Sequence, residues 1–435
     1  MTYSKNESLC RDNLESLQLK RLKETLASVY TLVPFYKEKF DKLGIKPENI
    51  NSLEDISKLP FTKKQDLRDN YPYGLFAIDM DQIVRIHSSS GTTGKPTVVG
   101  YSEHDMDIWS EVMARVFTMG GLTSKDILQN STGYGLFTGG LGFHTAAERM
   151  KIAVIPSSTG FTSRQLLLLK DFKATAITGT PSFALHMAEK AKAEGYDIKK
   201  DFHLKVGFFG AEPASKGLKD EISKIWGIDY VEVYGLSEII GPGVASSCKH
   251  SELLHINEDH FYPEIIDPKT GEVLPDGQRG ELVITTLTKQ ALPIIRYRTG
   301  DITSLTKIPC KCGRTLARIE SIVGRADDML VINGVNVFPS QIEHVLSNID
   351  GITLNYQIIA QKKGYLDKLM IDIELNENIM SENIRELENL KRSIQHEMLN
   401  NLYINVDVKL VAPKSIIRSE GKAVRVIDKR RNNGI

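Results

Sequence analysis

Residues 88–100 read Ser-Ser-Ser-Gly-Thr-Thr-Gly-Lys-Pro-Thr-Val-Val-Gly, a dense run of hydroxyl side chains and glycines. Gly91 and Gly94 permit tight or left-handed backbone, and such a backbone turns successive N–H groups into one concavity that suits an anion. The hydroxyls add donors, and Lys95 adds a positive charge. The two valines that follow indicate a strand, so we expect a loop that joins two strands and cradles phosphate. A Ser/Gly linker is the alternative interpretation.

The spacing of this loop differs from that of the common P-loop. The glycines before Lys95 are placed differently, and no serine or threonine directly follows the lysine. The loop alone therefore does not identify a nucleotide-binding site, and other motifs in the chain are needed to show whether it binds a nucleotide.

The composition is that of an ordinary globular protein. A chain of 435 residues suggests two or three domains. Lys+Arg and Asp+Glu both total 55, so no basic excess points to nucleic acid. No apolar run has the length of a membrane span, the N-terminus lacks the apolar core of a signal peptide, and the four cysteines do not resemble a secreted disulfide framework. We expect a cytoplasmic enzyme that binds neither nucleic acid nor a membrane.

Helical and strand-like segments alternate downstream of the loop, which predicts a parallel sheet. Upstream, residues 13–45 show helical spacing with a break at 33–36, and we expect Thr62 to cap a further helix. Ligands collect at the carboxyl ends of parallel strands. The candidate strand ends are residues 179–182, 210–212 and 234–238.

From Phe261 the pattern changes to short strands and turns, with the segment 296–301 expected to follow an apolar strand. A charged joint at 324–328 precedes a smaller unit. The predicted fold class is α/β: a large N-terminal domain of parallel and mixed sheets with helices and a β-rich subdomain, then a small mobile C-terminal α+β domain. We place the boundary between residues 1–326 and 327–435.

Two further patterns carry chemistry. The segment 134–142 is rich in glycine and holds two aromatic side chains, Tyr134 and Phe137. Glycine lets a backbone approach a ligand, and aromatic rings can wall an apolar group. A glycine-rich loop beside core aromatics is the alternative.

Five cysteine and histidine residues form two short clusters, Cys248, His250, His255, Cys310 and Cys312. The Cys-Lys-Cys-Gly segment resembles a zinc knuckle, and with one further cysteine and one histidine it would complete a closed, structural Cys₃His site. We choose His255 over His250, because a strand-like residue follows it. Buried thiols without a metal are the alternative.

Five motifs occur in an order that resembles the adenylate-forming acyl-CoA synthetase superfamily: residues 88–100, Tyr234–Glu238, Tyr297–Asp301, Gly324–Asp328 and Gly421-Lys422. The segments 134–142, 234–248 and 418–430 are similar to the phenylacetate–CoA ligase branch, and the resemblance runs nearly end to end. It implies that a carboxylate attacks the α-phosphate of ATP and gives an acyl-adenylate. The thiol of CoA then displaces AMP to form a thioester.

The resemblance also implies roles for individual residues. The β- and γ-phosphates would lie against Ser88, Ser89, Ser90, Gly91, Thr92, Thr93, Gly94 and Lys95. Glu238 would bind Mg²⁺, as a hard carboxylate suits a hard cation; the alternative is a carboxylate at a helix N-terminus. Tyr234 would stack on adenine or serve as a core tyrosine. The base would be bordered by Gly210, Ala211, Glu212 and Gly235.

Asp301 would accept hydrogen bonds from the ribose hydroxyls, and Arg325 would steady the same region; an ordinary surface ion pair is the alternative. Lys422 would be the adenylation lysine, carried by the C-terminal domain, and would otherwise be a solvated side chain. Asp327 would be the hinge about which that domain rotates.

The acyl pocket implied by the resemblance holds Tyr134, Phe137 and Ile240, which suggests an aryl-acetic acid. Thr145 and Ala146 depart from the tyrosine and glycine that we expect in the phenylacetate branch, so indoleacetate or another aryl acid stays open. The expected partners are a small carboxylic acid, ATP and CoA, with Mg²⁺ and a structural Zn²⁺, and homodimers are common in the family. The alternatives are an adenylating transferase with a non-CoA acceptor and a non-catalytic nucleotide-binding protein.

Overall fold

The computed structural model describes residues 2–88, 96–136, 138–325, 330–332, 335–363, 366–377, 384–402, 404–418 and 425–432. The chain begins with helices α1 (Arg11–Leu32), α2 (Pro34–Lys42) and α3 (Lys64–Asp69) and the short 3₁₀ turns η1 (Lys5–Ser8), η2 (Pro47–Asn49), η3 (Glu54–Lys58) and η4 (Met80–Gln82). The helical segment predicted for residues 13–45 is thus confirmed as two helices that meet at Val33. Leu14, Leu22 and Leu26 of α1 are fully buried.

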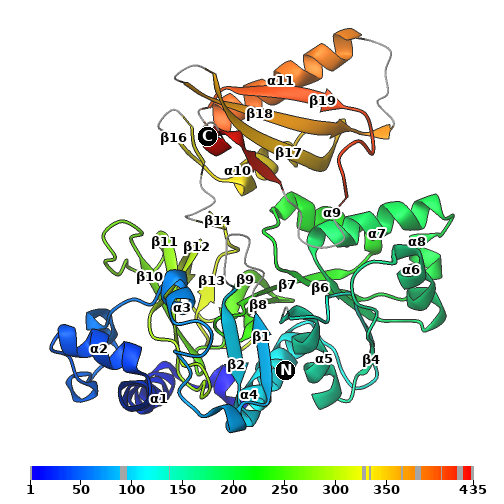
Figure 1. Ribbon diagram of the computed structural model, residues 1–435. Helices are drawn as coiled ribbons and strands as arrows, with labels where there is room; N and C mark the ends of the chain where they lie inside the picture. Colours follow the sequence, from blue (N-terminus) through cyan, green and yellow to red (C-terminus); the bar gives the residue numbers. More distant parts are fainter. Residues whose placement is uncertain are drawn as a thin grey trace.

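A twelve-stranded mixed sheet forms the centre of the large unit (Figure 1). Its parallel half has the order β7-β6-β5-β3-β4 and consists of β3 (Ile127–Asn130), β4 (Ala153–Ile155), β5 (Ala176–Gly179), β6 (Val206–Gly210) and β7 (Asp229–Leu236). The alternation of strands and helices therefore predicted the parallel arrangement correctly.

The other half of the sheet is antiparallel and continues from β7 in the order β8-β9-β13-β12-β11-β10, with β14 paired to β12. Its strands are β8 (Gly241–Cys248), β9 (Ser251–Ile256), β10 (Phe261–Ile266), β11 (Arg279–Thr286), β12 (Tyr297–Thr306), β13 (Arg318–Ile319) and β14 (Gly324–Arg325). The strands from β10 onward are the β-rich part expected from the change of pattern at Phe261, whereas β8 and β9 precede that residue and were not predicted.

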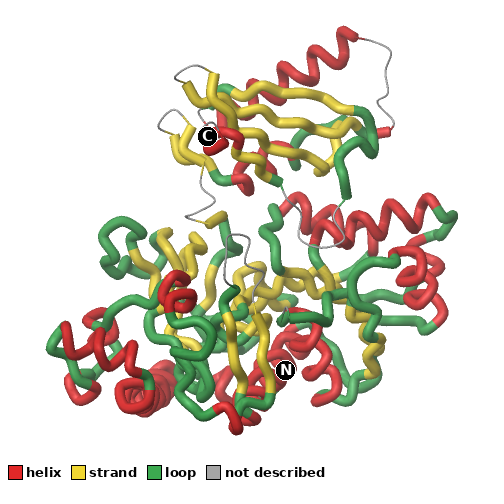
Figure 2. Tube along the Cα trace, in the orientation of Figure 1, coloured by secondary structure: helices red, strands yellow, loops and turns green. Residues whose placement is uncertain are grey.

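Helices lie around the parallel half of the sheet (Figure 2). They are α4 (Glu103–Met119), α5 (Gly139–Arg149), α6 (Thr162–Asp171), α7 (Pro181–Ala193), α8 (Ile198–Asp201) and α9 (Lys216–Trp226). Helix α4 begins with a capping box, in which the Ser102 hydroxyl accepts from the Asp105 N–H at 3.1 Å and Asp105 accepts from the Ser102 N–H at 3.0 Å. Trp109 and Phe117 of α4 are fully buried, so this helix is a central part of the core.

The strands β1 (Arg85–Ser88) and β2 (Val98–Tyr101) form a separate antiparallel pair in which Ser88 lies opposite Val98. The prediction that the Ser/Thr/Gly stretch joins two strands is therefore confirmed. Residues 89–95 themselves lie outside the described part of the chain.

The C-terminal unit is a small α+β structure that lies above α7 and α9 in Figure 1. It contains β15 (Leu330–Ile332), β16 (Val335–Val337), α10 (Pro339–Leu346), β17 (Ile352–Lys363), β18 (Leu366–Leu375), α11 (Ile384–Leu402), β19 (Val406–Val411), β20 (Val426–Asp428) and η6 (Lys429–Asn432). Its main sheet has the order β19-β18-β17-β20. The α/β class with a small α+β unit agrees with the prediction, while the boundary at residue 327 stays a prediction.

Two local predictions were wrong. Thr62 does not cap α3, whose N-cap is Lys63; instead Thr62 is buried and donates from Oγ1 to the Ile295 carbonyl oxygen at 2.6 Å. The apolar residues 291–295 before the segment 296–301 do not form a strand, and Tyr297 itself begins β12. In both cases the tertiary pairing of Thr62 with Tyr297 outweighs the local pattern.

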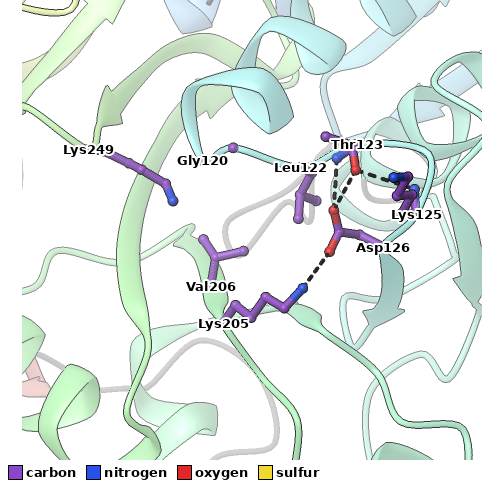
Figure 3. Close-up of a pocket in the computed structure, with 9 residues that line it drawn as sticks. Gly120, Leu122, Thr123, Lys125, Asp126, Lys205, Val206 and Lys249 are labelled. Carbon is purple, nitrogen blue, oxygen red and sulfur yellow. Dashed lines mark hydrogen bonds and ion pairs between the residues drawn. The ribbon is translucent and has the colours of Figure 1, made fainter.

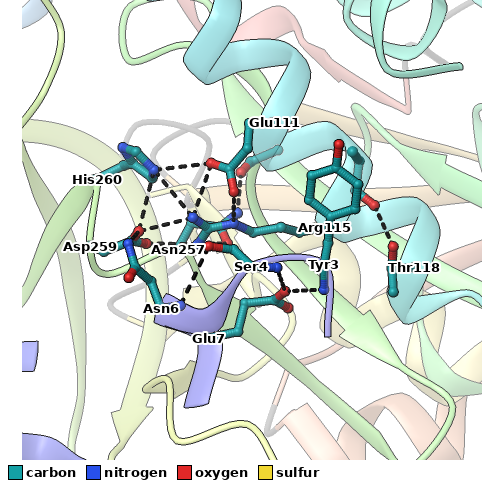
Figure 4. A network of polar contacts seen from close by, with 12 residues as sticks. Tyr3, Ser4, Asn6, Glu7, Glu111, Arg115, Thr118, Asn257, Asp259 and His260 are labelled. Carbon is teal, nitrogen blue, oxygen red and sulfur yellow. Dashed lines mark hydrogen bonds and ion pairs between the residues drawn. The ribbon is translucent and has the colours of Figure 1, made fainter. Parts of the chain in front are cut away.

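A buried polar network fastens the N-terminal segment to the large unit (Figure 4). Asp259 accepts two hydrogen bonds from Arg115 of α4, at 2.7 and 2.9 Å, and one from Asn6 at 2.9 Å. Glu7 is fully buried and pairs with Arg314. The first residues are therefore part of the folded core. None of the helices in the described ranges is long and apolar enough to cross a membrane.

Candidate active site and cysteine–histidine cluster

The carboxyl ends of the parallel strands lie at one edge of the sheet. There the N–H of Ser182, after β5, donates to Oε1 of Glu212, after β6, at 2.6 Å. Ala211 has a φ of 70°, a strained conformation for a residue with a β-carbon that recurs at functional sites. A side chain on Gly210 would meet the Val233 carbonyl oxygen at 2.2 Å, so glycine is required there by strand packing. The predicted strand-end residues are thus brought together.

The Asp301 carboxylate accepts hydrogen bonds from two other predicted site residues. Its Oδ2 accepts a hydrogen bond from the Tyr234 hydroxyl at 2.6 Å, and its Oδ1 accepts one from Arg325 at 3.1 Å. The pairing of β12 with β14 places Asp301 opposite Arg325. Burial, reinforced by the Asp301 charge, raises the pKa of Tyr234 well above its ordinary value, so the hydroxyl keeps its proton. The Asp301 side chain is 11% exposed, which does not fit an ordinary surface ion pair.

Glu238 is buried, with 6% of its surface exposed, in the turn between β7 and β8. Because no helix begins there, the alternative interpretation as a carboxylate at a helix N-terminus is wrong. The Thr97 hydroxyl donates to its Oε1 at 3.4 Å, and Lys64 Nζ lies 3.9 Å from the same oxygen. Lys289 Nζ donates to the Glu238 carbonyl oxygen at 3.3 Å, and burial lowers the pKa of Lys289 to about 8.

Sequence reasoning did not single out Lys64 or Lys289. Neither residue belongs to one of the recognised motifs, and it is the folding of distant segments that brings both lysines to Glu238. No signal in the sequence would have found them.

Of the residues predicted to line an acyl pocket, Tyr134 and Ile240 are described, and each has its own hydrogen-bond partners. The Tyr134 hydroxyl accepts from Asn130 Nδ2 at 2.6 Å and lies 3.0 Å from His144 Nδ1. Ile240 is 1% exposed, and its carbonyl oxygen accepts from the Tyr101 hydroxyl at 3.0 Å. Thr145, which departs from the expected pattern, donates within α5 to the Leu141 carbonyl oxygen at 3.1 Å.

Several predicted residues lie outside the described part of the chain. They are Ser89, Ser90, Gly91, Thr92, Thr93, Gly94, Lys95, Phe137, Asp327 and Lys422. Ser88 is described, and its N–H donates to the Leu136 carbonyl oxygen at 3.1 Å.

A cavity of about 260 Å³ lies at the opposite edge of the sheet, beside the amino ends of β3 and β6 (Figure 3). Three lysines line it, but Lys205 pairs with Asp126 at 3.5 Å and Lys249 pairs with Asp229 at 3.1 Å. The cavity is therefore separate from the edge that carries Glu238 and Asp301.

Cys248, His255, Cys310 and Cys312 converge, with their ligand atoms all within 4.8 Å of one another. The sulfurs of Cys248 and Cys310 are 3.9 Å apart, and Cys312 Sγ is 3.7 Å from His255 Nε2. All four cysteines of the chain are free thiols. His250 does not belong to this group among the described residues. The cluster contains the four residues that the sequence analysis selected.

The surroundings of the cluster give the thiols of Cys248 and Cys312 different pKa values. Burial raises the pKa of Cys248 to about 12. Burial also opposes ionisation of Cys312, but hydrogen bonds with His255 and Arg314 lower its pKa to about 5. Arg314 in turn pairs with the buried Glu7, so the N-terminal segment supports the loop that carries Cys310 and Cys312.

Comparison with known proteins agrees with this geometry. The family model of the AMP-binding enzymes matches residues 19–288, and that of the AMP-binding enzyme C-terminal domain matches residues 334–430. These matches show that the chain is an adenylate-forming, AMP-binding enzyme.

Proteins of similar sequence show which family of AMP-binding enzymes the chain belongs to. Phenylacetate-coenzyme A ligases of Thermus thermophilus and Escherichia coli are 44% and 46% identical, over 98% of this chain and 98% and 97% of theirs. The chain belongs to the phenylacetate–coenzyme A ligase family. It is an AMP-forming acid–thiol ligase, as the sequence analysis predicted.

Solved structures place the chain in the same fold. A 2-hydroxyisobutyryl-CoA ligase in its postadenylation state superposes with a TM-score of 0.93 at 30% identity, covering 98% of this chain and 92% of that one. The same ligase in its thioesterification state gives a TM-score of 0.72 at 31% identity, covering 98% and 91%.

Proposed function

We propose that the protein joins an aryl-acetic acid of the phenylacetate class to CoA at the expense of ATP. The observation that carries this proposal is the group of four phenylacetate-coenzyme A ligases that are 44–46% identical over 98% of this chain. Their shared name also favours CoA over another acceptor. Tyr134 and Phe137, together with Ile240, are proposed to contact the acyl group.

The residues of the strand edge can bind and orient ATP. Asp301 is held by Tyr234 and Arg325, so its carboxylate is fixed in place to accept hydrogen bonds from ribose hydroxyls. Gly210, Ala211, Glu212 and Gly235 are proposed to border the base. Ser88, the last residue of β1, and residues 89–95, which follow it in the sequence, are proposed to hold the β- and γ-phosphates.

Glu238 fits the Mg²⁺ that reactions of ATP require. A hard carboxylate suits this ion, which is often bound through one or two carboxylates with phosphate and water as the remaining ligands. The ion would neutralise phosphate charge. The Thr97 hydroxyl donates to the Glu238 carboxylate at 3.4 Å, and Lys289 donates to the main-chain carbonyl oxygen of Glu238 at 3.3 Å, so the side chain and the backbone of Glu238 each have a partner.

The test is release of pyrophosphate by the purified chain with ATP, Mg²⁺ and a panel of acids, with and without CoA. Phenylacetate and indoleacetate lead the panel, and acetate, benzoate and a fatty acid are controls. We expect repeated turnover to require both an aryl acid and CoA, whereas ATP and the acid without CoA release pyrophosphate in a single turnover, because the acyl-adenylate stays bound. Release of pyrophosphate at the same rate without CoA would indicate a transferase with another acceptor, and no turnover with any aryl acid would exclude the substrate class.

We also propose that the cysteine–histidine cluster binds a structural Zn²⁺. In a tetrahedral site, Zn–S and Zn–N bonds of ordinary length place two sulfurs about 3.8 Å apart and a sulfur and a nitrogen about 3.6 Å apart. The corresponding distances here are 3.9 and 3.7 Å. Four protein ligands leave no open position, so the ion would have no part in the reaction.

Metal analysis tests this site. We expect one zinc per wild-type chain, loss of the metal in Cys310→Ser and a lower unfolding temperature for that variant, because bound metal contributes folding free energy. Cys10→Ser is the matched control, since Cys10 is an exposed free thiol outside the cluster. A wild-type chain that stays metal-free after growth with added zinc, and whose unfolding temperature zinc does not change, would contradict the proposal.

A further inference from the structure

The C-terminal unit contacts the large unit through α10, which meets the start of α9. Glu343 of α10 is 3% exposed, and its Oε1 accepts a hydrogen bond from the N–H of Ser215 at 2.9 Å. Ser215 is the N-cap of α9. A carboxylate at this place satisfies an N–H group at the start of the helix and faces the positive end of the helix dipole. Glu343, a residue of the C-terminal unit, thus makes a hydrogen bond to the large unit.

The C-terminal unit holds Glu343 in this direction. The Tyr356 hydroxyl of β17 donates to its second oxygen, Oε2, at 2.8 Å, and Arg425 Nε lies 3.6 Å from the same atom. The Arg425 guanidinium stacks on the Tyr356 ring, 4.4 Å from its centroid. The two carboxylate oxygens therefore have separate partners, since Oε1 binds across the interface and Oε2 is fixed within the small unit.

Arg418 makes a second contact across the interface. It donates to both carboxylate oxygens of Glu189 of α7, at 3.1 and 3.2 Å. Within its own unit it donates to both oxygens of the buried Glu374, at 2.7 and 2.8 Å. Paired hydrogen bonds between an arginine and a carboxylate fix orientation as well as distance. Glu189 is therefore held by a guanidinium that Glu374 has already oriented.

The two helices also approach closely. A β-carbon on Gly217, in the first turn of α9, would lie 2.5 Å from Cβ of Ser347, the C-cap of α10. Contacts at this distance do not occur, so the observed docking requires glycine at position 217. The three nearest atoms that this β-carbon would meet all belong to Ser347 of the small unit, and within α9 itself alanine is the better helix former.

We propose that Glu343 and Arg418 are positioning residues that hold the C-terminal unit docked on α7 and α9 for adenylation and that are not needed for thioester formation. Arg418 and Arg425 flank the sequence that contains Lys422, so the proposal rests on the proposed function. The chain superposes better on the ligase in its postadenylation state than on the same ligase in its thioesterification state. Contacts that exist in one of two arrangements favour that arrangement alone.

The test separates the two half-reactions. Gly217→Ala, Glu343→Gln and Glu189→Gln are each compared with wild type for pyrophosphate release from ATP and aryl acid, and for thioester formation from synthetic phenylacetyl-adenylate and CoA. We expect adenylation to fall about tenfold, the size of a moderate coupling between two sites, and thioester formation to stay unchanged. Ser347→Gly should restore Gly217→Ala, and Lys224→Ala, on the exposed face of α9, should behave like wild type.

A second measurement needs no substrate, so it does not depend on which aryl acid the enzyme uses. Hydrogen exchange at the Ser215 amide, which donates to Glu343, should be faster in Glu343→Gln than in wild type. Equal exchange in the two proteins, or an equal loss of both half-reactions, overturns the proposal. Failure of the proposed function is recognised separately, as a folded wild-type chain that shows protected Ser215 but no turnover with any aryl acid.

Discussion

Replacing Lys422 with alanine lowers the rate of adenylation by about 10²–10³-fold, the effect expected when one preorganised charge is removed from a transition state. In the proposed reaction a carboxylate attacks the α-phosphate, so negative charge gathers where the new bond forms. The neighbouring arginines cannot replace the lysine. Arg418 is bound by two carboxylates, and Arg425 lies 3.6 Å from Glu343.

The half-reactions again distinguish this effect from a loss of structure. Pyrophosphate release without CoA should fall in Lys422→Ala, while thioester formation from synthetic acyl-adenylate should be retained, because that step makes no new bond to the α-phosphate. Lys409→Ala removes an exposed lysine of β19 and is the matched control. A loss in both half-reactions, or one shared by Lys409→Ala, would contradict the role of Lys422.

The features that the sequence predicted depend on short stretches of chain. The hairpin around residues 88–100 follows from glycine and valine within thirteen residues, and the strand ends follow from alternating local patterns. The cysteine–histidine cluster was predictable because Cys-Lys-Cys limits the chemistry to few choices, and the strand-like residue after His255 separated it from His250.

The features that the sequence did not predict depend on partners far apart in the chain. Lys289 reaches Glu238 across 51 residues, and Glu343 reaches Ser215 across 128. A lysine or glutamate outside a motif has the same appearance whether it is solvated or buried. Thr62 gave an incorrect prediction for the same reason, since its hydroxyl binds a carbonyl group 233 residues away rather than the helix beside it.

The network around Asp259 is another such feature, and we expect it to stabilise the fold. Asp259 is fully buried and faces two arginines, Arg115 at 2.7 Å and Arg21 at 3.7 Å, with His260 3.3 Å away. Glu111 supplies the other carboxylate, 2.8 Å from Arg115. Removing the Asp259 charge leaves the buried Arg115 and the half-buried Arg21 with Glu111 as the nearby carboxylate, and water cannot reach Arg115 to replace the lost partner.

We therefore expect Asp259→Asn to lower the free energy of unfolding at pH 7 by about 3–5 kcal/mol, the cost of breaking a buried ion pair from one side. Denaturant unfolding followed by circular dichroism measures the change. Glu38→Gln is the control, because the pair of Glu38 with Lys42 is exposed, with 67% and 71% of the two side chains accessible, and water and salt screen such a pair. Equal effects of the two substitutions would show that the network does not stabilise the fold.

The pH dependence of the unfolding free energy is a second test of the contribution that the Asp259 charge makes to stability. Burial alone would raise the pKa of Asp259, but the charges of His260 and Arg115 lower it well below its ordinary value. A carboxyl group whose pKa is lower in the folded state stabilises the fold above its unfolded pKa, about 3.9, and loses that contribution as the pH falls towards the folded pKa. The difference in unfolding free energy between wild type and Asp259→Asn should thus stay constant from pH 7 to about pH 5 and shrink below about pH 4. A difference that does not change with pH would instead assign the effect to the shape and hydrogen bonds of the side chain, because asparagine changes these at every pH.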